Sequence, residues 1–200
     1  FKPEEFSASV QGCDVRIGEN CVQGGLDRYE LHAAAESYAA DLVFTRQAPS
    51  WRPGSGMAYS GWRDSKYFGW VVPIPYGAVE GTVVFDGKKR HVRGACYHDH
   101  NWGNVALGNT IDHWYWGRAH VGDFTAIFVE MVTRPVPKLG PLKLNTFLLV
   151  QGQEILTDDG VPLSLATSDF KEGPGGRLYP EKLDFTWQTD ADRVALSLRN

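Results

Sequence analysis

The segment Tyr97–Asn104, with the sequence YHDHNWGN, holds two histidines, an aspartate, two asparagines and a tryptophan. Imidazoles and carboxylates at this density can bind a metal ion, transfer protons as general acids and bases, or form a structural hydrogen-bond network. The segment alone leaves all three interpretations open. Ionisable side chains beside aromatic rings are rarely buried without specific partners, so the cluster as a whole favours a function.

A metal site would use His98 and His100 as neighbouring ligands and take a third ligand from another strand, with His113, His120 and Asp112 as the candidates. A His-x-His pair is a weak signal by itself, and no Glu-x-x-His element accompanies it. The sequence also lacks a Gly-rich phosphate loop and a GxSxG elbow. We therefore expect chemistry that uses no metal ion and no organic cofactor.

The elements that position this segment are predicted to be strands. Short β-type runs divided by Gly, Pro, Asn and Asp fill the chain, and helical periodicity is nearly absent. Asp86-Gly87 and Gly122-Asp123 each separate two such runs, which predicts tight hairpins, and a third hairpin is predicted around Thr157–Gly160. Consecutive antiparallel hairpins favour an all-β fold that closes into a barrel or curled sheet.

On a strand, alternate side chains share a face. One face of the quoted segment would carry Cys96, His98, His100 and Trp102, and the other would carry Tyr97, Asp99 and Asn101. Polar groups lie on both faces, and a single β-bulge would reverse this assignment.

The next run presents a possible aromatic wall. Trp114, Trp116 and Arg118 share a face there, so two indoles lead to a guanidinium. The alternative for each tryptophan is ordinary core packing.

A possible acid follows on the run after that, where Phe128 and Glu130 share a face. A buried Glu130 would pair with a cation such as Arg118, or it would remain protonated near neutral pH. A protonated carboxyl group among aromatic rings can protonate an alkene or epoxide, and the rings can stabilise the resulting cation. The alternative is a strand-end carboxylate that reaches solvent.

Composition limits the classes of partner. The chain has 200 residues, 42% of them hydrophobic, and a formal net charge of -4 without a basic stripe, so we expect no nucleic-acid partner. No apolar run approaches the roughly 20 residues that span a bilayer, so we expect a cytoplasmic protein without stable membrane insertion. The three cysteines are expected to be reduced thiols. The oligomeric state is left open.

The stretches YFGWVVPIPYGAVEGTVVFDGKKRHVRGACYHDHNWGN and WYWGRAH resemble the carotenoid 1,2-hydratase family, also called hydroxyneurosporene synthase-like, over roughly residues 28–133. The resemblance implies a lipocalin-like antiparallel β-barrel with the start of a second β-barrel-like domain, without metal or organic cofactor. The family is longer than this chain, which implies that strands before and after it are missing. Members hydrate carotenoid double bonds or, in fungal secondary metabolism, resemble enzymes of pericyclic or cation-type cyclisation.

The expected domains are residues 1–135, a first lipocalin-like β domain incomplete at its N-terminus, and residues 144–200, part of a second β domain. Between them, residues 136–143 belong to a Pro-rich stretch that cannot form a central strand and are expected to be a linker.

The resemblance also suggests residue roles. A catalytic His and Trp of the family fall on His100 and Trp102, and a later Tyr and Asp fall on Phe128 and Glu130 in an ungapped placement. The acid is then kept as Glu130, but the tyrosine hydroxyl is lost at Phe128. This loss disfavours simple hydration and favours protonation of an apolar substrate whose cation is captured internally.

The sequence thus predicts a cyclase or isomerase of a hydrophobic terpenoid, prenylated or polyene natural product. Asp99 or Glu130 would be the general acid, and His98 and His100 would set its protonation or act as base. The residues expected to contact the substrate are Tyr97, Trp102, Trp114, Trp116, Arg118 and Phe128. The alternatives are a carotenoid-type hydratase and a non-catalytic lipocalin-like carrier of a hydrophobic ligand.

Overall fold

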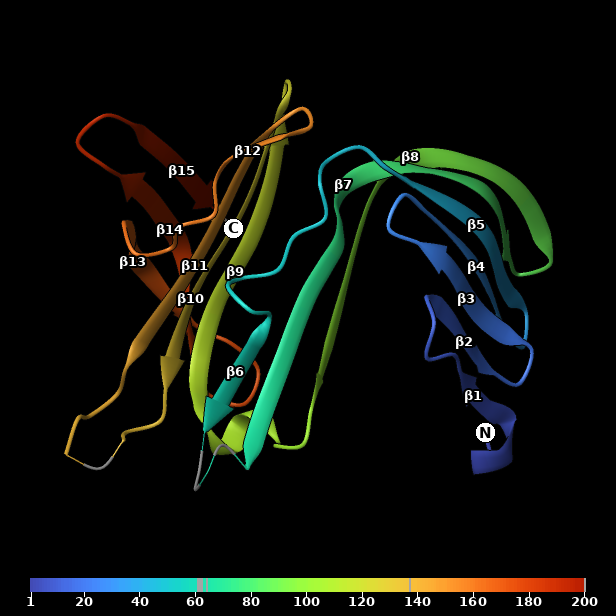
Figure 1. Ribbon diagram of the computed structural model, residues 1–200, viewed down its shortest axis with the longest axis horizontal. Helices are drawn as coiled ribbons and strands as arrows, with labels where there is room; N and C mark the ends of the chain where they lie inside the picture. Colours follow the sequence, from blue (N-terminus) through green and yellow to red (C-terminus); the bar gives the residue numbers. More distant parts are fainter. Residues whose placement is uncertain (61–62, 64, 137, 200) are drawn as a thin grey trace. The chain divides into compact units, whose positions relative to one another are not determined.

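The computed structural model describes residues 1–60, 63, 65–136 and 138–199 (Figure 1). Within these ranges the chain forms strands and two 3₁₀ turns, Pro3–Glu5 and Leu107–Asn109, and contains no α-helix. No helix among the described residues is long and apolar enough to cross a membrane. The sheets are antiparallel, so the expected all-β, antiparallel class is confirmed.

Among the described residues the strands form three sheets. The first follows the order β1-β2-β3-β4-β5-β7-β6, with β8 paired to β7; the second follows β12-β11-β10-β9, and the third follows β13-β14-β15. The strands of the first sheet are β1 (Phe6–Ala8), β2 (Cys13–Ile17), β3 (Asn20–Gly25), β4 (Arg28–Ala35), β5 (Tyr38–Arg46), β6 (Met57–Ser60), β7 (Lys66–Phe85) and β8 (Lys88–Gly103). Those of the other two are β9 (Ile111–Val121), β10 (Phe124–Thr133), β11 (Lys143–Gln151), β12 (Glu154–Thr157), β13 (Leu163–Glu172), β14 (Leu178–Gln188) and β15 (Arg193–Arg199).

The chain divides into two compact units. The first unit contains Phe1–Gly56, Gly69–Trp102 and Gly152–Glu154, and the second contains Met57–Phe68, Gly103–Gln151 and Ile155–Asn200. The expected linker lies between β10 and β11, which pair with each other in the second sheet. The domain boundaries expected from the sequence stay predictions.

The first unit has its core inside the curve of its sheet. Tyr29 on β4, Ile74 on β7 and Cys96 on β8 form a buried cluster. Strands β4 and β8 are not hydrogen-bonded neighbours, so the sheet must curl to bring Tyr29 and Cys96 together. The three cysteines are free thiols, as expected.

The two tight hairpins predicted from the sequence are confirmed. Asp86 and Gly87 join β7 to β8 with φ angles of 48° and 73°, the left-handed geometry that favours Asp-Gly in a two-residue turn. Gly122 and Asp123 join β9 to β10, and Gly122 has a φ of 58°.

Replacing Gly87 with alanine should lower the free energy of unfolding by about 1 kcal/mol, because an L side chain is strained at positive φ although the added Cβ meets only open space. Gly94 on β8 is the matched control: its Cβ position is also open, and its φ is not in the left-handed region. Urea unfolding of Gly87→Ala and Gly94→Ala checks this. Equal effects of the two substitutions would contradict the assignment of the cost to backbone conformation.

The third predicted hairpin, at Thr157–Gly160, is wrong. Strand β12 pairs with β11 and β13 pairs with β14, so this segment passes from the second sheet to the third. Its turn chemistry is local: the Asp159 amide donates to the Thr157 hydroxyl at 3.2 Å, and the Val161 amide donates to the Asp159 carboxylate at 2.8 Å. Such bonds stabilise the local conformation of the loop but do not choose the next strand's partner.

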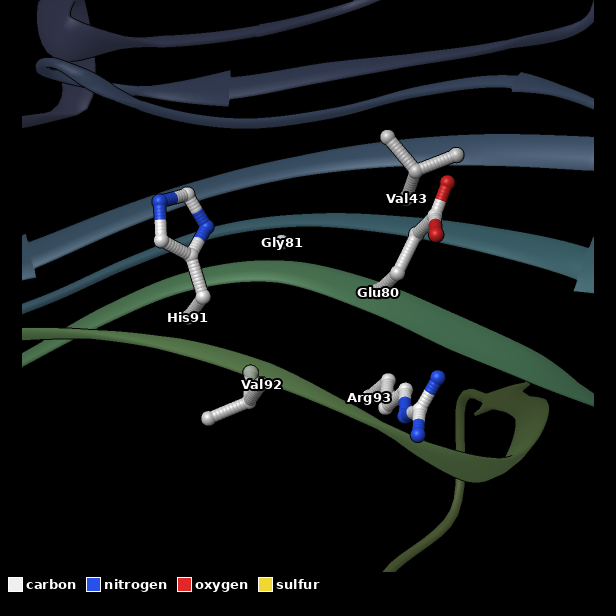
Figure 2. A pocket seen from close by; sticks show the side chains of 6 residues that line it. All are labelled: Val43, Glu80, Gly81, His91, Val92 and Arg93. Carbon is white, nitrogen blue, oxygen red and sulfur yellow. The ribbon is translucent and has the colours of Figure 1, made fainter.

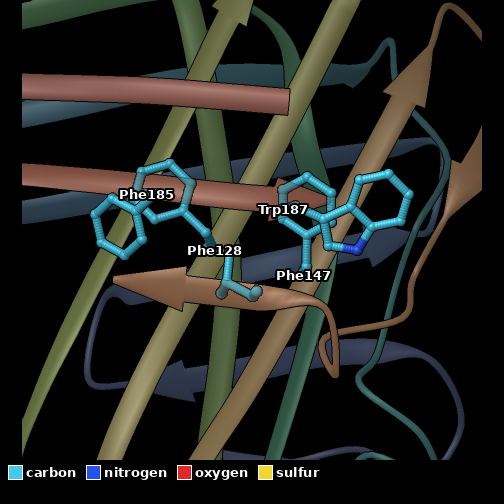
Figure 3. Packing of buried hydrophobic residues seen from close by; sticks show 5 residues of the cluster. Phe128, Phe147, Phe185 and Trp187 are labelled. Atoms are coloured by element: carbon cyan, nitrogen blue, oxygen red, sulfur yellow. The ribbon is translucent and has the colours of Figure 1, made fainter. Parts of the chain in front are cut away.

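The second unit has an aromatic core between its two sheets (Figure 3). The Phe128 and Phe185 rings have centroids 3.9 Å apart, and the Phe147 and Trp187 rings stack at 5.4 Å. Phe128 and Phe147 come from the second sheet, and Phe185 and Trp187 come from the third. Gly117 lies directly opposite Phe128, and a Cβ there would come within 2.4 Å of the phenylalanine ring.

Candidate functional site

In the first unit, one face of β8 presents a hydrogen-bonded carboxylate. The Tyr97 hydroxyl and the Trp70 indole N–H both donate to Oδ2 of Asp99, at 3.1 and 3.0 Å. The Trp70 ring in turn packs edge-on against Trp51, with centroids 5.4 Å apart. Tyr97 and Asp99 share a face, as the alternation predicted. The contacts with Trp70 and Trp51 were not predicted.

The opposite face of β8 carries His98, His100 and Trp102. His98 is half-buried against Tyr29, with ring centroids 4.7 Å apart. His100 and Trp102 stack at 5.5 Å, and both are exposed. Gly69 makes room for the indole, because a Cβ at that position would lie 2.3 Å from the Trp102 ring.

Burial lowers the pKa of His98; the nearby Asp99 carboxylate opposes this shift, and His100 adds to it.

The lowered pKa of His98 predicts a pH-dependent stability. Since the folded state binds the imidazole proton of His98 less tightly than the unfolded chain does, the unfolded state binds more protons at mildly acidic pH. The free energy of unfolding should therefore fall as the pH drops below the ordinary histidine value of about 6.5. His98→Gln should reduce this pH dependence, whereas His91→Gln, at an exposed position on the same strand, should leave it in place. Urea unfolding of both variants is measured at pH 7.5 and 5.5, about one unit above and below the ordinary histidine pKa. If the free energy of unfolding of His98→Gln depends on pH as strongly as that of the wild type, His98 is not the source of the pH dependence.

In the second unit, Glu130 on β10 is only 5% exposed. The Lys143 ammonium lies 2.9 Å from its Oε1 atom. Of the two outcomes expected for a buried Glu130, the ion pair is therefore the one observed, which makes the carboxylate a hydrogen-bond acceptor.

The strand register places Tyr115 and Asn145 directly opposite Glu130 on its two neighbouring strands. Burial raises the pKa of the Tyr115 phenol, and Glu130 raises it further, while Lys143 opposes the shift. The Asn145 amide donates to the Leu163 carbonyl at 2.7 Å. Its Oδ1 atom is buried and has no hydrogen-bond partner in the described part of the chain.

His113 extends this polar row toward solvent. Its ring packs edge-on against Tyr115 with centroids 5.4 Å apart, and its Nδ1 atom lies 2.8 Å from the Asp112 carboxylate. The polar row thus consists of His113, Tyr115, Glu130, Lys143 and Asn145, on the face of the sheet that also carries Phe128 and Phe147. Sequence reasoning missed Tyr115, Lys143 and Asn145 as partners of Glu130.

The cation paired with Glu130 is Lys143 and not Arg118. Arg118 lies opposite Ile127, an odd number of residues from Glu130, so it points to the other face of the sheet. Trp114 and Trp116 share the face of Arg118 and are 52% and 39% exposed. The predicted aromatic wall therefore does not line the face of Glu130. Phe128 does share that face, but it is buried in the core.

The predicted site residues are thus divided between the two compact units. Tyr97, His98, Asp99, His100 and Trp102 belong to the first unit, and Trp114, Trp116, Arg118, Phe128 and Glu130 belong to the second. Within the described ranges, no three His, Cys, Asp or Glu side chains gather in a metal-binding arrangement.

Two open pockets lie elsewhere on the first unit. One of about 530 Å³ surrounds Gly81 and includes Glu80, His91 and Arg93 (Figure 2). The other, of about 370 Å³, includes Cys13 and Arg28. None of the residues predicted to bind substrate lines either pocket.

Comparison with known proteins identifies a family and a fold. A family model described as Diels-Alderase-like matches residues 38–170. A hydroxyneurosporene dehydrogenase of Chlorobaculum tepidum is 44% identical over 55 residues, covering 24% of this chain and 14% of that protein. The quinolone epoxide rearrangement protein penF of Penicillium thymicola is 31% identical over 67 residues, covering 34% of this chain and 18% of that protein.

The crystal structure of a candidate AttH protein from Nitrosomonas europaea superimposes with a TM-score of 0.65 at 18% identity, covering 92% of this chain and 57% of that one. This similarity concerns the fold alone. The matches thus span little of the curated relatives and somewhat more than half of the solved structure.

Proposed function

Because the chain belongs to the Diels-Alderase-like family, we propose that its protein is a cyclase or isomerase that rearranges a hydrophobic natural product without an organic cofactor. We propose a quinolone epoxide as the first substrate class to test, since the name of the penF relative specifies one. The observation that carries the proposal is Glu130, a buried carboxylate on an aromatic face with a tyrosine directly opposite.

The polar row offers both proton partners that an epoxide rearrangement needs. The Tyr115 phenol is protonated near neutral pH, as tyrosine ordinarily is, and it donates its proton to the epoxide oxygen as the carbon–oxygen bond breaks. The electron-deficient carbon is captured within the substrate, and the carboxylate of Glu130 takes the proton that the carbon skeleton then loses. Return of that proton from Glu130 to Tyr115 restores the site, and the product is an isomer of the substrate.

Lys143 and the aromatic rings have supporting roles. Lys143 balances the charge of Glu130 between turnovers. Phe128 and Phe147 are buried in the core beside the carboxylate and exclude water from that side of it, but they are not placed to contact the substrate. His98, Asp99, His100 and Trp102 stay candidates for substrate contact on the first unit.

Incubating the protein with quinolone epoxides in ¹⁸O-labelled water tests the proposal by mass spectrometry. An unlabelled isomer of the substrate is the expected product. A product that gains one labelled oxygen would identify a hydratase instead. Binding with recovery of unchanged substrate would identify a carrier.

A further inference from the structure

We propose that Trp51 and Trp70 form a second ligand-binding site, in the first unit, for a flat apolar molecule with an acceptor oxygen, and that the Trp51 indole N–H binds that oxygen. The inference does not depend on the proposed activity of Glu130.

The buried N–H of Trp51 is the starting observation. The side chain is only 4% exposed, and its Nε1 atom has no acceptor among the residues that the structure describes. A buried donor without an acceptor costs roughly 1–3 kcal/mol. Proteins seldom retain such a group unless water or a ligand completes it.

The backbone holds Trp51 firmly in place. Its amide donates to the Val72 carbonyl at 2.9 Å, and the Val72 amide donates back at 2.8 Å. The neighbouring Ser50 hydroxyl donates to the Pro73 carbonyl at 2.7 Å. This short bridge fixes the loop to β7, so the unpaired donor has a defined position.

Trp70 provides the second surface of the site. Its ring meets Trp51 at an interplanar angle of 80°, so the two indoles form an aromatic corner. The N–H of Trp70 is already used by Asp99 at 3.0 Å. A ligand bound at this corner would therefore contact the ring of Trp70, whose N–H is used by Asp99, and could accept a hydrogen bond from the N–H of Trp51. A planar ring with a carbonyl or epoxide oxygen meets both requirements.

The first test compares two indole N–H groups by substitution. Trp187 is 6% exposed, and its indole N–H donates to the Asp159 carbonyl at 2.8 Å. Trp187→Phe therefore removes an existing hydrogen bond, whereas Trp51→Phe removes a donor without an acceptor among the described residues. Both substitutions remove buried ring atoms, so Trp51→Phe should lower the thermal unfolding midpoint by the packing cost alone, whereas Trp187→Phe should lower it further because it also loses a hydrogen bond. If Trp51→Phe lowers the midpoint as much as Trp187→Phe does, an internal water or other structural partner satisfies the donor and the proposal fails.

The second test is binding of quinolin-2-one, with naphthalene as the probe that lacks an acceptor oxygen. In ¹⁵N-indole NMR spectra, quinolin-2-one should move the Trp51 N–H signal downfield and naphthalene should not. Trp51→Phe should weaken quinolin-2-one binding by about fivefold or more. An unmoved Trp51 signal, or equal binding by the variant, overturns the site. Neither readout requires turnover, so this result and the isotope experiment succeed or fail separately.

Discussion

Replacing Glu130 with glutamine is expected to lower turnover by about two to four orders of magnitude while the protein stays folded. The amide keeps the shape of the side chain, but it cannot accept the proton that leaves the substrate. The fold should tolerate the change because the Lys143 side chain is 62% exposed, and water can solvate its ammonium group when the carboxylate is lost. Turnover of a quinolone epoxide and the unfolding midpoint are measured on the same preparation.

Two further variants locate this effect. Glu154→Gln changes an exposed carboxylate on β12 and should retain full turnover. Tyr115→Phe removes the proposed proton donor and should also lose turnover without unfolding. Wild-type turnover by Glu130→Gln would eliminate the acid–base assignment and leave Asp99 as the remaining predicted carboxylate.

Replacing Phe128 with alanine should lower the free energy of unfolding by about 3–5 kcal/mol, because the ring is almost fully buried and its removal leaves a cavity in the core. It packs against Phe185 from the third sheet, so its removal weakens the contact between the two sheets of the second unit. Urea unfolding monitored by circular dichroism measures the loss.

Phe124 provides the matched control on the same strand. It is 44% exposed, and Phe124→Ala should change the free energy of unfolding by less than about 1 kcal/mol. Similar losses from both variants would mean that the cost comes from strand propensity rather than from the aromatic core.

Local chemistry allowed much of the fold to be predicted. The hairpins at Asp86-Gly87 and Gly122-Asp123 depend on residues that tolerate positive φ, and this is a property of the residues themselves. The shared face of Tyr97 and Asp99 follows from the two-residue period of a strand. At Thr157–Gly160 the predicted hairpin was wrong, because the partner of a strand is chosen by distant residues.

The candidate site depended on contacts between distant residues. By sequence alone, Phe128 and Glu130 could be assigned to one face of a strand, and a buried Glu130 could be expected to need a cation. Which cation it would be was decided by strand register, because a shift of one residue moves every side chain to the opposite face. The observed register brings Lys143, Tyr115 and Asn145 to Glu130. Likewise, the meeting of Trp51, Trp70 and Asp99 required a loop, β7 and β8 to fold together, and no periodicity within one strand encodes such a contact.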